Sequence, residues 1–286
     1  VMAMLALLVL PVLAKIKIEA MEHDVQEITG RNFDSVISKF RDAAVASVFM
    51  FKPGDDVKSF DAYNEVAKEL KGMAKITAIN CEDWPVFCKD HEGTETPKIK
   101  LFPVNPMPAY LYKGKLEKGA ISKAVSKMIQ NSATDLTKDN VDAWLTSDAT
   151  KPKVILFSNK DKIPTILKAL SSETVFRRSV KFGFCKQAED TILKRFGIKK
   201  FPTFLMLRGG KLEQKEQYKG EMTFREIYTW VNLYSESGMG DKVHTKGSAE
   251  EQEVTLEEAK PWLVQEVPEL TAASQADICF KGEGLC

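Results

Sequence analysis

Short apolar runs recur along the chain, and they predict strands that are buried in a protein core. The runs at residues 45–51 and 154–157 are continuous or nearly so, as expected for central strands covered on both faces. Alternation at residues 25–29 predicts a shorter strand. Further strands are predicted at residues 75–80, 99–102, 109–112, 178–185, 203–207 and 212–218, with a leading strand at 15–19.

Stretches with helical periodicity separate these runs. The apolar residues of segment 60–70 recur at the spacing of one helix face, and Gly72 follows where such a helix would end. Asn32 or Asp34 is placed to cap an earlier helix. Other helices are predicted at residues 84–89, 120–129, 142–145, 164–170, 189–196 and 224–234.

One block of sequence occurs twice. Ile28-Thr29-x-x-Asn32-x-Asp34 returns as Leu136-Thr137-x-x-Asn140-x-Asp142, so that Thr137 follows Thr29 by 108 residues. Each copy then has a proline, at Thr96-Pro97 and at Phe201-Pro202, and closes with a Tyr-Lys-Gly triplet at 112–114 and 218–220. Shared order and spacing over about a hundred residues predict two domains of one fold, at residues 15–131 and 132–237.

The segments outside the two copies differ in character. Residues 1–14 are apolar and end in small residues, which predicts a secretory signal peptide; a buried first strand is the alternative. Residues 238–261 are rich in glycine and acidic residues, as in a solvated linker. Within residues 262–286, Val267-Pro268-Glu269-Leu270-Thr271 resembles the opening of each copy, so we expect the start of a truncated third domain.

The charge and apolar content exclude two classes of partner. The net charge of +1, with acids and bases intermixed, provides no basic surface for nucleic acid. No apolar stretch reaches the roughly 18 residues that a membrane-spanning helix needs, so no span is predicted in this chain. We also expect no cofactor.

The five cysteines fit an oxidising compartment. Cys81 and Cys88 share their spacing with Cys279 and Cys286, and we interpret both pairs as structural disulfides. A zinc site is the alternative, but the chain has no C-x-x-C pair and only three histidines, so no metal is expected. Cys185 is predicted to be a buried free thiol, with a reactive thiolate as the alternative.

Four segments together resemble the thioredoxin-fold domains of protein disulfide isomerases: residues 25–29, 48–51, 97–102 and 197–204. The resemblance implies an α/β fold with tandem thioredoxin-like domains, each a central mixed β-sheet flanked by helices. It also implies that Pro97 and Pro202 are the family's cis-prolines, which border a substrate groove. The spacing of Cys81 and Cys88 matches a structural disulfide of some catalytic-type domains in that family.

The family's catalytic C-x-x-C is missing from both copies. It lies between the buried strand and the next helix, where the helix N-terminus lowers the pKa of the first thiol. Here those positions are residues 51–58 and 157–164, and neither segment contains a cysteine. By the family mechanism, neither domain can exchange thiols and disulfides.

These features favour a redox-inactive, disulfide-isomerase-like protein of the endoplasmic reticulum lumen that binds unfolded secretory polypeptides or another folding factor. We expect Thr96, Pro97, Phe201 and Pro202 to form the substrate grooves. Phe51 and Phe157 are expected to line them. One alternative is an enzyme, a disulfide isomerase or oxidoreductase whose C-x-x-C lies beyond Cys286. Another is a structural arm that positions a downstream domain.

Overall fold

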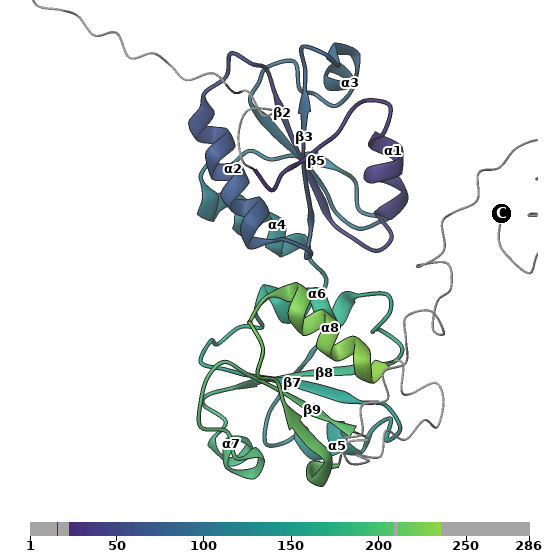
Figure 1. Ribbon diagram of the computed structural model, residues 1–286, viewed down its shortest axis with the longest axis vertical. Coiled ribbons are helices and arrows are strands. Elements are labelled where there is room, and N and C mark those ends of the chain that lie inside the picture. The colour runs from purple at the N-terminus through teal and green to yellow at the C-terminus, as the bar shows by residue number, and fades with distance from the viewer. Residues whose placement is uncertain (1–15, 17–22, 209–210, 236–286) are drawn as a thin grey trace, which may run out of the picture. The chain divides into compact units, whose positions relative to one another are not determined.

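The computed structural model describes residue 16, residues 23–208 and residues 211–235 of the chain. These residues form two five-stranded mixed β-sheets, each flanked by helices, as predicted (Figure 1). The predicted signal peptide, linker and third-domain segment lie outside the described residues, as do Cys279 and Cys286. No helix among the described residues is long and apolar enough to cross a membrane.

The first sheet has the strand order β1-β3-β2-β4-β5. Its central strands β2 (Ala46–Phe51) and β3 (Lys75–Asn80) are parallel, and β1 (Gln26–Glu27) extends the parallel part. Strands β4 (Lys98–Phe102) and β5 (Tyr110–Leu111) run antiparallel to their neighbours. The helices are α1 (Phe33–Val36), α2 (Val57–Glu69), α3 (Pro85–Asp90) and α4 (Lys118–Met128), with a 3-10 turn at Ser38–Phe40.

The second sheet repeats this topology with the order β6-β8-β7-β9-β10. Strands β6 (Thr134–Leu136), β8 (Lys181–Lys186) and β7 (Lys153–Ser158) are parallel. Strands β9 (Thr203–Leu207) and β10 (Lys215–Gln217) are antiparallel. The helices are α5 (Val141–Thr146), α6 (Thr165–Ser172), α7 (Asp190–Phe196) and α8 (Phe224–Ser235).

Both faces of each central strand are buried, which is why these strands read as apolar runs. All six residues of β2 and all six of β7 are buried. In the first sheet, Phe49 packs against Tyr63 and Phe60 of α2 on one face, while Met50 belongs to a cluster on the other face. The buried Tyr63 hydroxyl is satisfied by Ser47 Oγ at 2.8 Å and the Thr77 carbonyl at 3.0 Å.

Three elements of the structure differ from the sequence predictions, and one predicted strand stays untested. Strand β6 was not predicted. Strand β8 begins at Lys181 rather than at residue 178, because Phe176–Val180 forms a turn in which the Val180 N–H donates to the Phe176 carbonyl. Of the strand predicted at 212–218, Leu212–Gln214 is a 3-10 turn and only Lys215–Gln217 pairs with β9. The leading strand predicted at 15–19 lies outside the described residues apart from Ile16.

Candidate functional site

A cis-proline stands at the same place in each sheet. The Thr96–Pro97 and Phe201–Pro202 peptide bonds are both cis, and so is Asn105–Pro106, which was not predicted. The antiparallel register pairs Met50 with Lys98 and Phe157 with Thr203. The next step along each ladder therefore brings Pro97 opposite Phe51 and Pro202 opposite Ser158. We call this end of each sheet its cis-proline edge.

The predicted site residues are brought together at these edges. Thr96, Pro97 and Phe201 are half-buried, and Pro202 is exposed. In the second sheet the turn before β9 is fixed from both sides. Gly197 ends α7 in the left-handed region, with φ +71°, and the Thr203 hydroxyl donates to the Lys200 carbonyl at 2.8 Å. The backbone around Pro202 is thus held in place and accessible.

Contrary to the prediction, the rings of Phe51 and Phe157 do not line the cis-proline edges. Phe51 is 5% exposed and packs against Phe49 and Phe60, while Phe157 is 0% exposed and packs against Phe196. The reason is that β2 and β7 are covered on both faces up to their last residues, so these rings belong to the core.

Carboxylates occupy the first-sheet position where the family carries its reactive thiol. The Asp55 carboxylate accepts a hydrogen bond from the Lys52 N–H at 2.8 Å. Asp56 is the N-cap of α2, and its side chain accepts from the Lys58 N–H at 3.1 Å. These acids satisfy backbone donors at the helix start, as capping residues do. The segment organises a turn and contains no cysteine.

The corresponding loop of the second sheet is organised by a hydroxyl. Ser158 Oγ accepts a hydrogen bond from the Lys160 N–H at 3.1 Å, and the Ser158 carbonyl accepts from the Gln187 N–H at 2.9 Å. Pro164 then precedes α6 as its N-cap residue and has no side-chain cap. Neither of the loops that follow the central strands β2 and β7 therefore contains a thiol.

Three cysteines lie within the described residues. Cys81 and Cys88 form a buried disulfide with a Cα–Cα distance of 5.6 Å, which joins the end of β3 to α3. Cys185 on β8 is free and fully buried. Burial, followed by the carboxylates of Glu189 and Asp135, raises the pKa of Cys185 to about 12. This setting favours the neutral thiol over the reactive thiolate. Among the described residues, no three His, Cys, Asp or Glu side chains gather as a metal site.

Comparison with known proteins supports the same fold. The family described as "A6-like, middle domain", a thioredoxin-like domain, matches residues 121–228. A Dictyostelium discoideum protein named "Putative protein disulfide-isomerase" is 30% identical over 181 residues, which are 60% of this chain and 43% of that protein. The chain therefore contains a thioredoxin-like domain and is similar to a protein disulfide isomerase. The predicted resemblance is confirmed.

Solved structures share the fold. The crystal structure of full-length ERdj5 superposes with a TM-score of 0.52 at 16% identity, covering 74% of this chain and 33% of ERdj5. ERdj5 form I gives the same TM-score and identity over 75% of this chain and 30% of that one. At this identity the likeness concerns the fold alone. The disulfide-isomerase-like chain spans less than half the length of its Dictyostelium relative and about a third of ERdj5.

Proposed function

We propose that this disulfide-isomerase-like chain is a redox-inactive binding module that holds unfolded polypeptides at its two cis-proline edges. The observation that supports this proposal is that each edge keeps one feature of the family and lacks another. The cis peptide bond is present at Pro97 and Pro202, while the adjoining loop after the central strand contains no cysteine. A loop that lacks the attacking thiolate forms no mixed disulfide with a client. Binding is then the chemistry left to these edges.

Extended backbone is the client conformation that suits this geometry. The β7–β9 ladder ends at Phe157 and Thr203, beside the exposed Pro202. The half-buried Phe201 adds an apolar surface next to that backbone. An extended polypeptide can bind through hydrogen bonds to exposed backbone, and side-chain contacts then add selectivity. Unfolded chains offer such segments in abundance.

We place the protein in the secretory pathway, in the lumen of the endoplasmic reticulum. The support is the Cys81–Cys88 disulfide, since such bonds persist in oxidising compartments and are rare in the cytosol. The apolar segment at residues 1–14, which is predicted to be a signal peptide, also supports a location in the secretory pathway.

The decisive experiment measures binding and redox activity side by side. We expect the purified chain to slow the aggregation of a denatured, reduced test protein and to show no insulin reduction above the uncatalysed rate. Phe201→Ser should weaken the protection. Val175→Ser, which alters an exposed apolar residue between α6 and β8, serves as the matched control and should not. A chain that neither binds nor protects unfolded protein would overturn the proposal.

A second candidate is a segment of a longer disulfide isomerase with its C-x-x-C in another domain. One observation favours it: the chain spans only 43% of the Dictyostelium protein, whose name assigns that activity. The test is to look for a C-x-x-C in the full open reading frame and to assay isomerase activity of the full product. In that case the two thioredoxin-like domains would supply client binding to the catalytic domain.

A further inference from the structure

The two loops that form the second cis-proline edge come from neighbouring antiparallel strands. Strand β7 ends at Ser158 and β9 begins at Thr203, so the loop at 159–163 and the turn at 197–202 meet at one end of the sheet. Any extended chain that lies along Pro202 therefore passes both loops. Their side chains, together with Glu189 and Asp190 after the parallel strand β8, contribute to the electrostatic environment of the bound segment.

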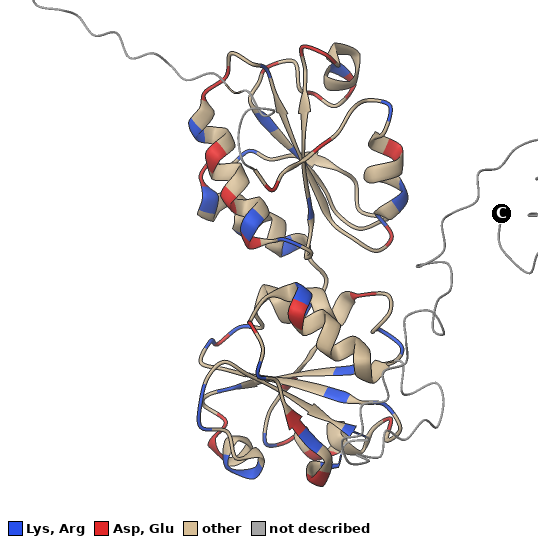
Figure 2. Cartoon of the chain, viewed as in Figure 1, with Lys and Arg blue, Asp and Glu red and all other residues tan. Residues whose placement is uncertain are grey.

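These loops carry four exposed lysines and one exposed acid. The acid is Asp161, and the lysines are Lys160, Lys162, Lys199 and Lys200. None of the four ammonium groups takes part in an ion pair with another described residue. Lys186, at the end of β8, differs because it pairs with Asp135 at 3.1 Å. In Figure 2, basic segments accordingly gather in the loops beside α7.

The same edge of the first sheet has the opposite character. Its loop after β2 carries Lys52, Asp55 and Asp56, and its loop before β4 carries Glu92 and Glu95. The neighbouring strand lysines are already engaged: Lys98 pairs with Glu95 at 3.3 Å and Lys100 with Glu92 at 3.2 Å. Because both domains share one topology, the fold does not dictate the basic charge of the second edge.

We infer that the cis-proline edge of the second domain selects extended polypeptide segments rich in Asp and Glu. This inference rests on the proposed function and names its client class. The four lysines, which form no ion pair with a described residue, supply charge complementarity. Phe201, Ile198 and the backbone beside Pro202 supply contacts that are independent of charge. Such exposed charges are screened over about 8 Å at physiological salt, so the selection weakens as salt rises.

The test uses the full chain and three fluorescent peptides of equal length in an anisotropy assay. One peptide carries interspersed glutamates in an otherwise apolar, extended sequence, the second replaces each glutamate with glutamine, and the third replaces each with lysine. We expect the glutamate peptide to bind about tenfold more tightly than the glutamine peptide at low salt, with the difference shrinking at high salt. The lysine peptide should not bind at this edge.

Two charge-reversed variants locate the effect. K199E/K200E should remove the preference for glutamate while leaving the glutamine peptide within about twofold. K123E/K127E makes the same change in net charge at exposed positions of α4 and should leave the preference intact. Circular dichroism confirms that both variants are folded.

Each result decides the inference. Equal affinity for the glutamate and glutamine peptides would overturn it. An equal loss of the glutamate preference in both variants would also overturn it, because net charge would then be responsible. Displacement of the peptide by an inorganic polyphosphate as readily as by unlabelled glutamate peptide would also overturn it, as general polyanion binding. If the glutamine peptide and unfolded protein bind without any acidic preference, this inference fails and the proposed function stands. If no peptide binds, both fail.

Discussion

Asn32 Oδ1 accepts a hydrogen bond from the backbone N–H of Thr29 over 2.7 Å, and the Thr29 hydroxyl accepts one in return from the Asn32 N–H over 3.2 Å. The second copy repeats the first bond, with Asn140 Oδ1 accepting from the Thr137 N–H over 2.9 Å. The recurring sequence block is therefore a turn that leads from an edge strand into the first helix of each domain. Asn32 is the N-cap residue, as one of the two predictions had it, but its side chain bonds backward rather than to the helix.

Replacing Asn140 with alanine should destabilise the second domain by about 1 kcal/mol. The substitution leaves the half-buried Thr137 N–H without its acceptor and also removes the bond from Asn140 Nδ2 to the Asp135 carbonyl, at 2.9 Å. Urea unfolding measures the change. Asn159→Ala, at an exposed position, is the control and should shift the midpoint little. Equal effects from the two variants would mean that the turn bond contributes nothing.

The sequence predicted the elements whose residues are buried in a regular pattern. Strand β9 has the predicted bounds because all five of its residues are buried. Strand β6 escaped prediction because two of its three residues are exposed, which leaves no alternation to detect. The 3-10 turn at Leu212–Gln214 looked like a strand because Leu212 is partly buried against the core and mimics an inward-facing strand residue.

The candidate site was only partly visible in the sequence. The prolines could be placed by resemblance, and their peptide bonds are cis. The burial of Phe157 could not be foreseen, because a residue at the end of a strand can face either solvent or the core. The contact with Phe196 on α7 places the Phe157 ring in the core. The lysines of the second edge are 39 residues apart in the chain, from Lys160 to Lys199, and only the β7–β9 pairing brings their loops together. A comparison of the corresponding loops in the two copies of the repeat would have revealed the excess of lysines in the second copy.

Removal of the Cys81–Cys88 disulfide should destabilise the first domain by about 2.5 kcal/mol, the loop-entropy value for a closure of this length. The double variant C81A/C88A tests this by chemical unfolding followed through Trp84, the one tryptophan between residues 15 and 131. A reducing agent should lower the stability of the wild-type domain and leave that of the variant unchanged. Equal sensitivity of both proteins to reductant would assign the effect to another cysteine pair.

Cys185 should resist alkylation in the folded protein at pH 8. Its thiol is fully buried, and its pKa is raised to about 12, so almost no thiolate forms. Because the folded pKa lies above the unfolded value of about 8.5, the unfolded state loses its proton first as pH rises. The contribution of this thiol to stability is therefore complete below about pH 8 and declines toward pH 12.

Site-resolved mass spectrometry after iodoacetamide treatment measures this protection. Labelling of Cys185 should be slow in buffer and rapid in guanidinium chloride, which provides the accessible reference. Fast labelling of the native protein would revive the reactive-thiolate alternative. In that case Cys185→Ser would have to be compared with the wild type in the insulin-reduction assay.

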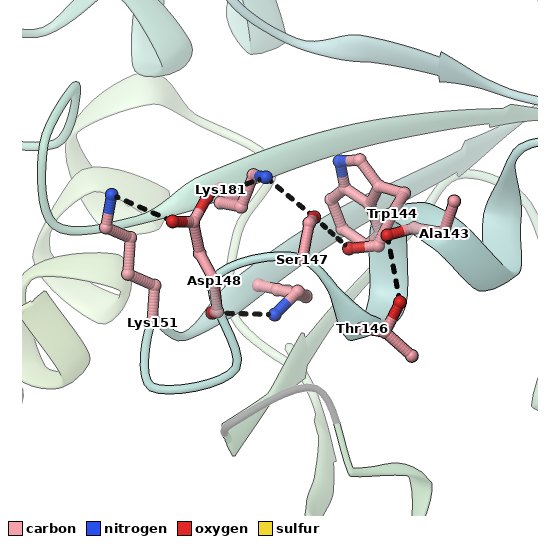
Figure 3. A network of polar contacts seen from close by, with 8 residues as sticks. Ala143, Trp144, Thr146, Ser147, Asp148, Lys151 and Lys181 are labelled. Atoms are coloured by element: carbon pink, nitrogen blue, oxygen red, sulfur yellow. Dashed lines mark hydrogen bonds and ion pairs between the residues drawn. The ribbon is translucent and has the colours of Figure 1, made fainter.

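Lys153 should be dispensable for stability at pH 7, although it is fully buried. Figure 3 shows the surrounding polar network, in which the Asp148 carboxylate pairs with Lys181 at 2.9 Å and with Lys151 at 3.7 Å. Among the described residues, Lys153 Nζ donates only to the Asp148 carbonyl, at 3.1 Å, and that carbonyl also accepts from the Lys151 N–H. Burial, together with the neighbouring Lys181, lowers the pKa of Lys153. Its ammonium therefore costs stability that a methionine of similar length would not.

We expect Lys153→Met to unfold at an equal or higher denaturant concentration than the wild type at pH 7. Because the pKa of Lys153 is lowered in the folded state, that state releases the proton first as pH rises, and the wild type gains stability toward pH 10. The advantage of the methionine variant should thus shrink between pH 7 and pH 10. Lys181→Met is the matched comparison and should destabilise the protein, since it breaks the pair with Asp148 and the 2.8 Å bond to Ser147 Oγ. If Lys153→Met proved the more damaging of the two, the buried ammonium would be a net stabiliser of the strand ends.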